Sequence, residues 1–163
     1  MIDSAEGYLG ESAFRRMIAS VPLVSVDLLL VRQGKVLLGL RRDEPARGTW
    51  FVPGGRIRRA ESIAAALQRV WSAELAGEMP IGQHELVGAY EHFYDCAFDG
   101  SAVATHYVVL AYRFYISETV ALHPASHREQ WWAPVDACPS QHNGYTVHPN
   151  TRAYFPSLRD ISQ

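Results

Sequence analysis

The residues with the clearest chemical potential lie in the stretch from Gly54 to Glu74. Gly54 and Gly55 end the run "FVPGG", and two adjacent glycines allow a sharp turn that brings the backbone close to a ligand. A helix is predicted directly behind them, over residues 61–77, so its positive end would face the same place. This arrangement predicts a site for phosphate groups, although most glycine pairs are simple turns.

The helices that must support such a site are indicated by apolar residues at helical spacing. An amphipathic helix is predicted over residues 11–20, and the helix over residues 61–77 is expected to stop at Gly77. The apolar face predicted for this second helix comprises Ile63, Ala66, Leu67, Val70 and Ala73. A last helix is predicted over residues 148–155, and the end of the chain, residues 157–163, is expected to fray.

The strands are indicated by runs of apolar and β-forming residues between turn signals. They are predicted at residues 23–31, 36–42, 51–55, 84–94, 105–116 and 130–135. The "RQGK" sequence between the first two suits a hairpin turn. Because strands and helices alternate irregularly, the order predicts one α+β domain over residues 1–163, with a mixed sheet between helices.

Composition narrows the classes of protein that this chain can be. It has 163 residues, 48% of them hydrophobic, and a formal net charge of -2, which argues against binding to nucleic acid or to a membrane surface. The longest apolar run is broken by Ser25 and Asp27, and the N-terminus does not resemble a secretory signal. A cytoplasmic location is therefore expected, with Cys96 and Cys138 as free thiols.

A longer pattern of residue spacings that starts at Gly55 resembles the Nudix box. Gly55 is followed after five residues by Glu61, after seven more by Arg69, and then by Glu74. The preceding "WFVPGG" strengthens the match. The resemblance implies the Nudix fold, in which a mixed sheet lies between helices. For Glu61 alone, the alternative is an acidic residue favoured by the positive end of the helix.

The departures from the box fall on its acidic face. Val70 and Ala73 stand at two glutamate positions, and Ala76 stands at the late glycine position. Positions 70, 73 and 74 share one helical face, and paired Mg²⁺ ions need several carboxylates there. The resemblance therefore implies a single Mg²⁺, or Mn²⁺, bound by Glu74 and the carbonyl of Gly54. An ordinary solvated helix residue is the alternative for Glu74.

Further segments are similar to one branch of the superfamily, GDP-mannose mannosyl hydrolase, whose box also lacks two glutamates. They are "PLVSVD", "LLGLRR", "WFVPGGR", "AEL", "EHFYD", "THYVVL" and "NTRAYF", and they span about residues 13–155. The resemblance implies a homodimer that hydrolyses GDP-mannose or GDP-glucose to GDP and free sugar, by attack of water on the anomeric carbon with inversion. Two alternatives remain: a pyrophosphohydrolase that releases GMP and sugar 1-phosphate, and a nucleotide-sugar sensor without catalysis.

The resemblance also assigns the cationic residues of the site. Arg41 and Arg56 match the two arginines that clamp the diphosphate and promote its departure, and a guanidinium suits phosphate oxygens. Arg42 is the alternative to Arg41, because the alignment depends on a one-residue gap at "RQGK".

Three polar residues match groups that contact the sugar or the phosphates, namely Asp27, His92 and Tyr107. Tyr107 is also assigned to catalysis with the two arginines. The alternative for these residues is a polar side chain at a strand end, or core packing in the case of Tyr107. That alternative is weakest for Asp27, because a carboxylate inside an apolar run needs a partner.

His127 matches the general base of the family, four residues before Trp131. An alignment without a gap would place Arg128 there instead, but an imidazole titrates near neutral pH and a guanidinium does not. Ser126 stands where the family has a metal-binding glutamine. For His127 the alternative is a solvent-exposed loop residue.

Overall fold

The computed structural model describes residues 10–76, 78–80, 82, 84–116, 121, 123 and 127–159. The helices are α1 (Glu11–Ile18), α2 (Ile63–Glu74), α3 (Pro149–Arg152) and α4 (Phe155–Arg159). The strands are β1 (Leu23–Arg32), β2 (Lys35–Arg41), β3 (Trp50–Phe51), β4 (Gly54–Arg56), β5 (His84–Tyr94), β6 (Thr105–Tyr115), β7 (His127–Pro134), β8 (Gln141–His142) and β9 (Tyr145–Thr146). No helix in the described ranges is both long enough and apolar enough to cross a membrane.

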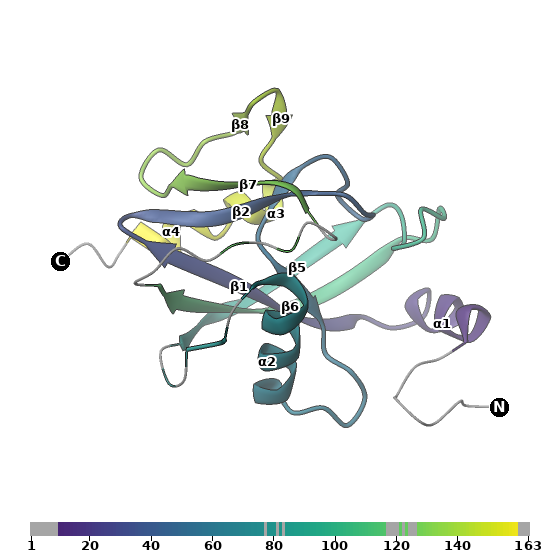
Figure 1. The fold of residues 1–163 in the computed structure, drawn as a ribbon. Coiled ribbons are helices and arrows are strands. Elements are labelled where there is room, and N and C mark those ends of the chain that lie inside the picture. Colours follow the sequence, from purple (N-terminus) through teal and green to yellow (C-terminus); the bar gives the residue numbers. More distant parts are fainter. Residues whose placement is uncertain are drawn as a thin grey trace.

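The main sheet is mixed, as predicted (Figure 1). Its strand order is β3-β2-β1-β6-β5, with β4 added beside β1 and β7 beside β2. Strands β1 and β6 run parallel, whereas the other pairs are antiparallel. The hairpin predicted at "RQGK" is confirmed, because Arg32 of β1 pairs with Lys35 of β2.

Strand β1 has two different antiparallel partners along its length, and the candidate site lies where one partner replaces the other. Val31 and Arg32 pair with β2, whereas Ser25 to Asp27 pair with β4. Beyond Val36, the edge of β2 that faced β1 pairs with β3 instead, at Gly39 and Leu40, so Asp27 lies where two parts of the sheet separate.

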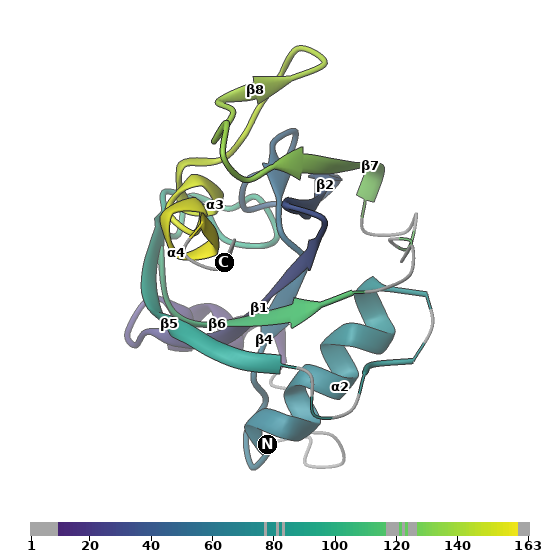
Figure 2. The same ribbon diagram turned by 90° about the vertical axis from the view of Figure 1, so that its left-hand side faces the viewer.

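Side chains of β1 alternate between two cores, as expected for a strand with both faces covered. Val26, Leu28 and Leu30 belong to the core that includes the apolar face of α2. Leu29 belongs to the core that includes Phe155 and the C-terminal helices. Figure 2 shows α2 on one side of β1 and β6, and α3 and α4 on the other. The predicted sheet between helices is confirmed.

The glycine pair is not the turn that the sequence predicted. Gly54 and Gly55 lie in β4, opposite Asp27 and Val26, and neither has a positive φ. Glycine is required here for close approach, since a Cβ on Gly54 would lie 2.3 Å from Asp27 Oδ1. The loop 57–62 also separates β4 from the helix, so the prediction that the helix follows at once was wrong.

Helix α2 is shorter than predicted, and its buried face is different. It ends at Glu74, where Leu75 forms the C-terminal cap, and Gly77 lies outside the described residues. Ile63 and Ala73 are exposed, whereas Trp71 is buried. The predicted face was therefore correct only in its centre, at Ala66, Leu67 and Val70.

Two predictions near the C-terminus also needed correction. Ser157 and Leu158 belong to α4, where Leu158 is buried, so the expected fraying is wrong up to Arg159. Residues 160–163 lie outside the described part. Strand β7 begins three residues earlier than predicted, at His127. The two cysteines are free, as predicted.

Candidate active site

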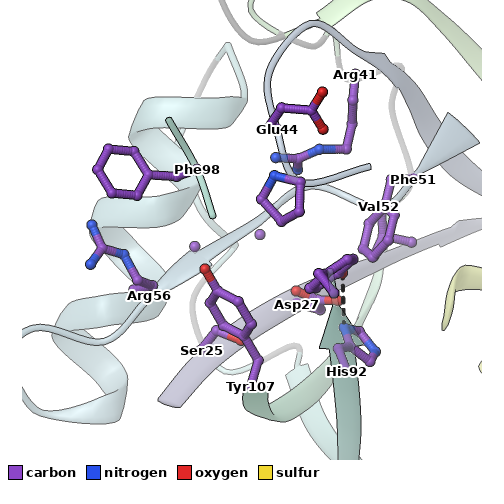
Figure 3. Close-up of a pocket in the computed structure, with 14 residues that line it drawn as sticks. Ser25, Asp27, Arg41, Glu44, Phe51, Val52, Arg56, His92, Phe98 and Tyr107 are labelled. Atoms are coloured by element: carbon purple, nitrogen blue, oxygen red, sulfur yellow. Dashed lines mark hydrogen bonds between the residues drawn. The ribbon is translucent and has the colours of Figure 1, made fainter. Parts of the chain in front are cut away.

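A cavity of about 200 Å³ lies where β1, β4, β5 and β6 meet (Figure 3). Six of the residues that the sequence assigned to the site line it: Asp27, Arg41, Gly54, Arg56, His92 and Tyr107. The sheet pairing explains this convergence, because Gly54 lies opposite Asp27, and His92 lies opposite Tyr107. Five separate segments of sequence therefore meet in one hollow.

Asp27 is a buried carboxylate that is held by a tyrosine. The residue is 5% exposed, and Oδ2 accepts a hydrogen bond from the Tyr154 hydroxyl at 2.7 Å. Burial raises the pKa of Asp27 to about 7, although the Tyr154 hydrogen bond and the charge of Arg41 oppose the rise. Asp27 therefore exists in both protonation states near neutral pH.

A neutral side chain at position 27 is expected to change the pH dependence of stability. Because the pKa of Asp27 is about 7 in the folded chain and 3.8 without the fold, the folded state binds an extra proton between these values. The contribution of this group is fully present below about pH 4 and is lost as the pH rises through about 7. Asp27→Asn cannot lose this contribution. We expect its melting temperature, relative to wild type, to rise from about pH 5 to about pH 8. Parallel curves would contradict this assignment.

His92 completes the polar cluster on the same side of the cavity. It is 3% exposed, and its Nε2 lies 3.0 Å from the Tyr154 hydroxyl. Burial lowers the pKa of His92 to about 4, and the nearby charge of His148 adds to this effect. The imidazole is therefore neutral at physiological pH and can donate one hydrogen bond and accept another.

The two predicted arginines line the cavity and contact aromatic rings. The guanidinium carbon of Arg56 lies 4.3 Å from the centre of the Phe14 ring, and that of Arg41 lies 5.7 Å from the centre of the Phe51 ring. Contacts of this kind hold a cation in place without neutralising it. Arg41 Nε is buried and has no hydrogen-bond partner among the described residues. The neighbouring Arg42 is exposed.

Tyr107 is available as a hydrogen-bond donor in the cavity. Burial raises the pKa of its hydroxyl above the ordinary value, although Arg56 and Arg41 oppose the rise. The hydroxyl therefore keeps its proton at neutral pH. Its ring packs edge-on against Tyr94, with 5.8 Å between the ring centres.

Glu74 and His127 form a pair with each other, and neither is among the residues that line the cavity. His127 Nε2 lies 2.8 Å from Glu74 Oε2, and the two side chains are 2% and 17% exposed. His127 lies in β7 and packs so closely on Gly39 that a Cβ there would be 2.1 Å from its Nδ1. The alternative of a solvent-exposed loop histidine is wrong. Ser126 lies outside the described residues.

Glu61, the other acidic residue retained from the box, has a structural partner. Its carboxylate accepts hydrogen bonds from Arg69 Nε at 2.6 Å and from the Arg58 backbone at 2.8 Å. The Arg69 hydrogen bond lowers the pKa of Glu61 to about 2. This pair ties the loop before α2 to the helix itself, and Val70 packs against Gly55 where the box would place a carboxylate.

The residues present fit a metal ion only in a limited way. No group of three or more histidine, cysteine, aspartate or glutamate side chains suited to a metal occurs in the part of the chain that the structure describes. One carboxylate, Glu74, and one carbonyl, Gly54, would leave most positions around Mg²⁺ to water and substrate. Mg²⁺ commonly binds through one or two carboxylates and substrate phosphates. Of these two donors only Gly54 lines the cavity, so the assignment of Glu74 to a metal ion at the diphosphate stays a prediction.

Sequence reasoning missed one residue of the polar cluster. Tyr154 lies 127 residues from Asp27, and the sequence indicated a helix and a resemblance to the family in its segment but no role for Tyr154 itself. The signal that could have found it is the buried carboxylate itself, because Asp27 requires a hydrogen-bond donor. Which residue donates depends on how the C-terminal helices pack on the sheet.

Comparisons with known proteins agree with this architecture. The family model described as the NUDIX domain matches residues 21–155. The chain is 40% identical over 108 residues to the low-salt glycan biosynthesis protein Agl8 of Haloferax volcanii, which covers 66% of this chain and 68% of that protein. The chain belongs to the NUDIX family, and this membership supports a hydrolase activity.

Solved structures show the same fold. The MutT NUDIX hydrolase from Burkholderia pseudomallei is similar with a TM-score of 0.67 and 23% identity, over 88% of this chain and 100% of that chain. The NUDIX domain of Shewanella oneidensis NrtR, solved as a complex with ADP ribose, is similar with a TM-score of 0.63 and 22% identity, over 93% of this chain and 92% of that chain. The predicted Nudix fold is confirmed.

Proposed function

We propose that this protein hydrolyses a GDP-sugar, GDP-mannose or GDP-glucose, to GDP and the free sugar. The observation that carries the proposal is that two arginines, Arg41 and Arg56, and a buried carboxylate, Asp27, line the same cavity. The oxygens of a diphosphate would accept hydrogen bonds from the guanidinium groups of both arginines. Family membership supports hydrolysis, and the similarity to GDP-mannose mannosyl hydrolase supports this substrate.

The residues of the cavity suit departure of a diphosphate from the anomeric carbon. Arg41 and Arg56 would donate hydrogen bonds to the phosphate oxygens and neutralise charge that develops as the bond to the sugar breaks. Tyr107 would donate its hydroxyl hydrogen to the same group. Asp27 would lie near the sugar, whose developing cation resembles that of glycosidase reactions. When bound at Glu74, Mg²⁺ or Mn²⁺ would supply further positive charge for the diphosphate.

The base that takes a proton from the attacking water is assigned to His127 by resemblance, and this assignment stays a prediction. His127 is hydrogen-bonded to Glu74, so the predicted base and the predicted metal ligand form one pair. The homodimer and the cytoplasmic location also stay predictions. The name of the Haloferax relative, a glycan biosynthesis protein, agrees with a role in the supply of nucleotide sugars.

The products in isotopically labelled water test the proposal directly. Purified protein is incubated with GDP-mannose, or with GDP-glucose, and Mg²⁺ in water enriched in ¹⁸O. We expect GDP and free sugar, with the label in the sugar, because water attacks carbon. GMP with the label in phosphate would contradict the proposal and indicate a pyrophosphohydrolase. Intact substrates that nevertheless bind would also contradict it and indicate a sensor.

A further inference from the structure

The Tyr154 hydroxyl lies between two residues of the cavity wall. It is 2.7 Å from Asp27 Oδ2 and 3.0 Å from His92 Nε2. All three side chains are buried, and Tyr154 is only 1% exposed. Figure 3 shows Asp27 and His92 on the opposite side of the cavity from Arg56. Tyr154 itself lies between α3 and α4 and is not among the residues that line the cavity.

The single hydrogen of the Tyr154 hydroxyl determines the direction of these two hydrogen bonds. A tyrosine hydroxyl has one hydrogen, and Tyr154 donates it to the Asp27 carboxylate. The contact with His92 then requires the imidazole to donate from Nε2 to the Tyr154 oxygen. His92 Nδ1 is left as an acceptor, and the Tyr94 hydroxyl lies 3.5 Å from it. The chain of donors therefore runs from Tyr94 through His92 and Tyr154 to Asp27.

Packing fixes the position of the Tyr154 oxygen. The ring is in edge contact with Tyr90, with 4.7 Å between the ring centres, and the neighbouring Phe155 is fully buried. The Tyr154 backbone N–H donates to the Thr151 carbonyl at 3.1 Å. A hydroxyl on a buried, packed ring cannot follow its partners, so the carboxylate and the imidazole must align to it.

We propose that Tyr154 is a positioning residue, which sets the tautomer of His92 and the orientation of Asp27, so that Asp27 can recognise the hydroxyl groups of the sugar through the acceptor positions that Tyr154 leaves open. Oδ2 is engaged by Tyr154, and Oδ1 is held beside Gly54. This inference rests on the proposed function for the identity of the ligand, but not for the arrangement of the three side chains. When Asp27 is held in one orientation, a sugar whose hydroxyl groups do not meet it leaves a buried polar group unpaired. The site would therefore discriminate strongly between sugars.

The variant Tyr154→Phe tests this role, because it removes one oxygen and keeps the ring. Tyr90→Phe is the matched control. Its hydroxyl is 3.1 Å from Ser157 Oγ, and Tyr90 is not among the residues that line the cavity. The first measurement is the tautomer of His92 by ¹⁵N-histidine NMR, at about pH 8.5 so that Asp27 is ionised. Wild type and Tyr90→Phe should carry the proton on Nε2, whereas Tyr154→Phe should lose this preference.

The second measurement is steady-state kinetics with GDP-mannose and GDP-glucose, together with calorimetric titration of GDP. In Tyr154→Phe, kcat/KM should fall by about 10–100-fold, as is typical when a supporting hydrogen bond is removed. The ratio of kcat/KM for the two sugars should move toward one, and the Kd for GDP should stay within about twofold. Tyr90→Phe should retain wild-type values for all three.

The two measurements separate this inference from the proposed function. If wild type does not cleave either GDP-sugar but the tautomer changes only in Tyr154→Phe, the proposed function fails and the positioning role stands. A wild-type His92 that carries its proton on Nδ1 would overturn the inference. Equal effects of the two substitutions on the tautomer or on kcat/KM would also overturn it, because they would indicate a general packing role.

Discussion

Replacing Arg56 with glutamine is expected to lower kcat/KM for GDP-mannose by about 10²–10³-fold, the usual effect of removing one group that stabilises developing charge. The Arg56 guanidinium lies on the cavity and is held over the Phe14 ring, so it is already placed for the diphosphate before substrate binds. Arg56→Lys keeps the charge but loses the planar pair of donors, and we expect an intermediate loss. Steady-state kinetics and calorimetric titration of GDP would measure both effects.

Arg59→Gln provides the control for this prediction. Arg59 is exposed in the loop that follows β4, so its replacement removes the same charge from the chain at a short distance in sequence. Its kcat/KM should stay within about twofold of wild type, since exposed charges contribute little. Activity of Arg56→Gln close to that of Arg59→Gln would remove Arg56 from the proposed mechanism.

Gly54→Ala is expected to damage both the stability and the activity of the protein. The new Cβ would lie 2.3 Å from Asp27 Oδ1 and 2.9 Å from the Val26 carbonyl, so β4 and β1 must move apart. Overpacking of this kind destabilises a fold by about 1–3 kcal/mol. A displaced Asp27 should also lower kcat/KM by about 10²-fold, because catalysis is sensitive to shifts of about 1 Å. Urea unfolding and steady-state kinetics are the measurements.

Gly88→Ala separates this steric effect from the general effect of adding a methyl group to a strand. A Cβ at Gly88 of β5 would meet Tyr90 at 3.5 Å, which is an ordinary contact. We expect its stability and its kcat/KM to remain near those of wild type. If Gly54→Ala had the same stability to urea and the same kcat/KM as Gly88→Ala, the close approach of Gly54 to Asp27 would not be required.

Local patterns in the sequence were sufficient for the elements of the fold. Apolar runs identified the long strands β1, β2, β5 and β6, and helical spacing identified α1 and the central part of α2. The predictions failed where a short pattern was compatible with two structures. The pair Gly54–Gly55 was interpreted as a turn, because the sequence shows that glycine is present but not whether it serves a positive φ or a close contact.

Several members of the candidate site could also be predicted from the residues and their resemblance to a known branch. Asp27, Arg41, Arg56, His92 and Tyr107 do line one cavity, although their roles stay proposals. In contrast, the resemblance gave no indication that Glu74 and His127 would bond to each other. That contact depends on how β7 aligns with β2 and how α2 packs on the sheet.

The sequence by itself determined the class of fold, the order of its main elements and the residue types available for chemistry, because these depend on neighbours in the chain. Only the tertiary structure decided that β1 exchanges β2 for β4 beside Asp27, and that Tyr154 supplies the hydrogen bond this carboxylate needs. The physical reason is that a buried polar group must be satisfied, whereas the identity of its partner depends on packing between segments that are 127 residues apart.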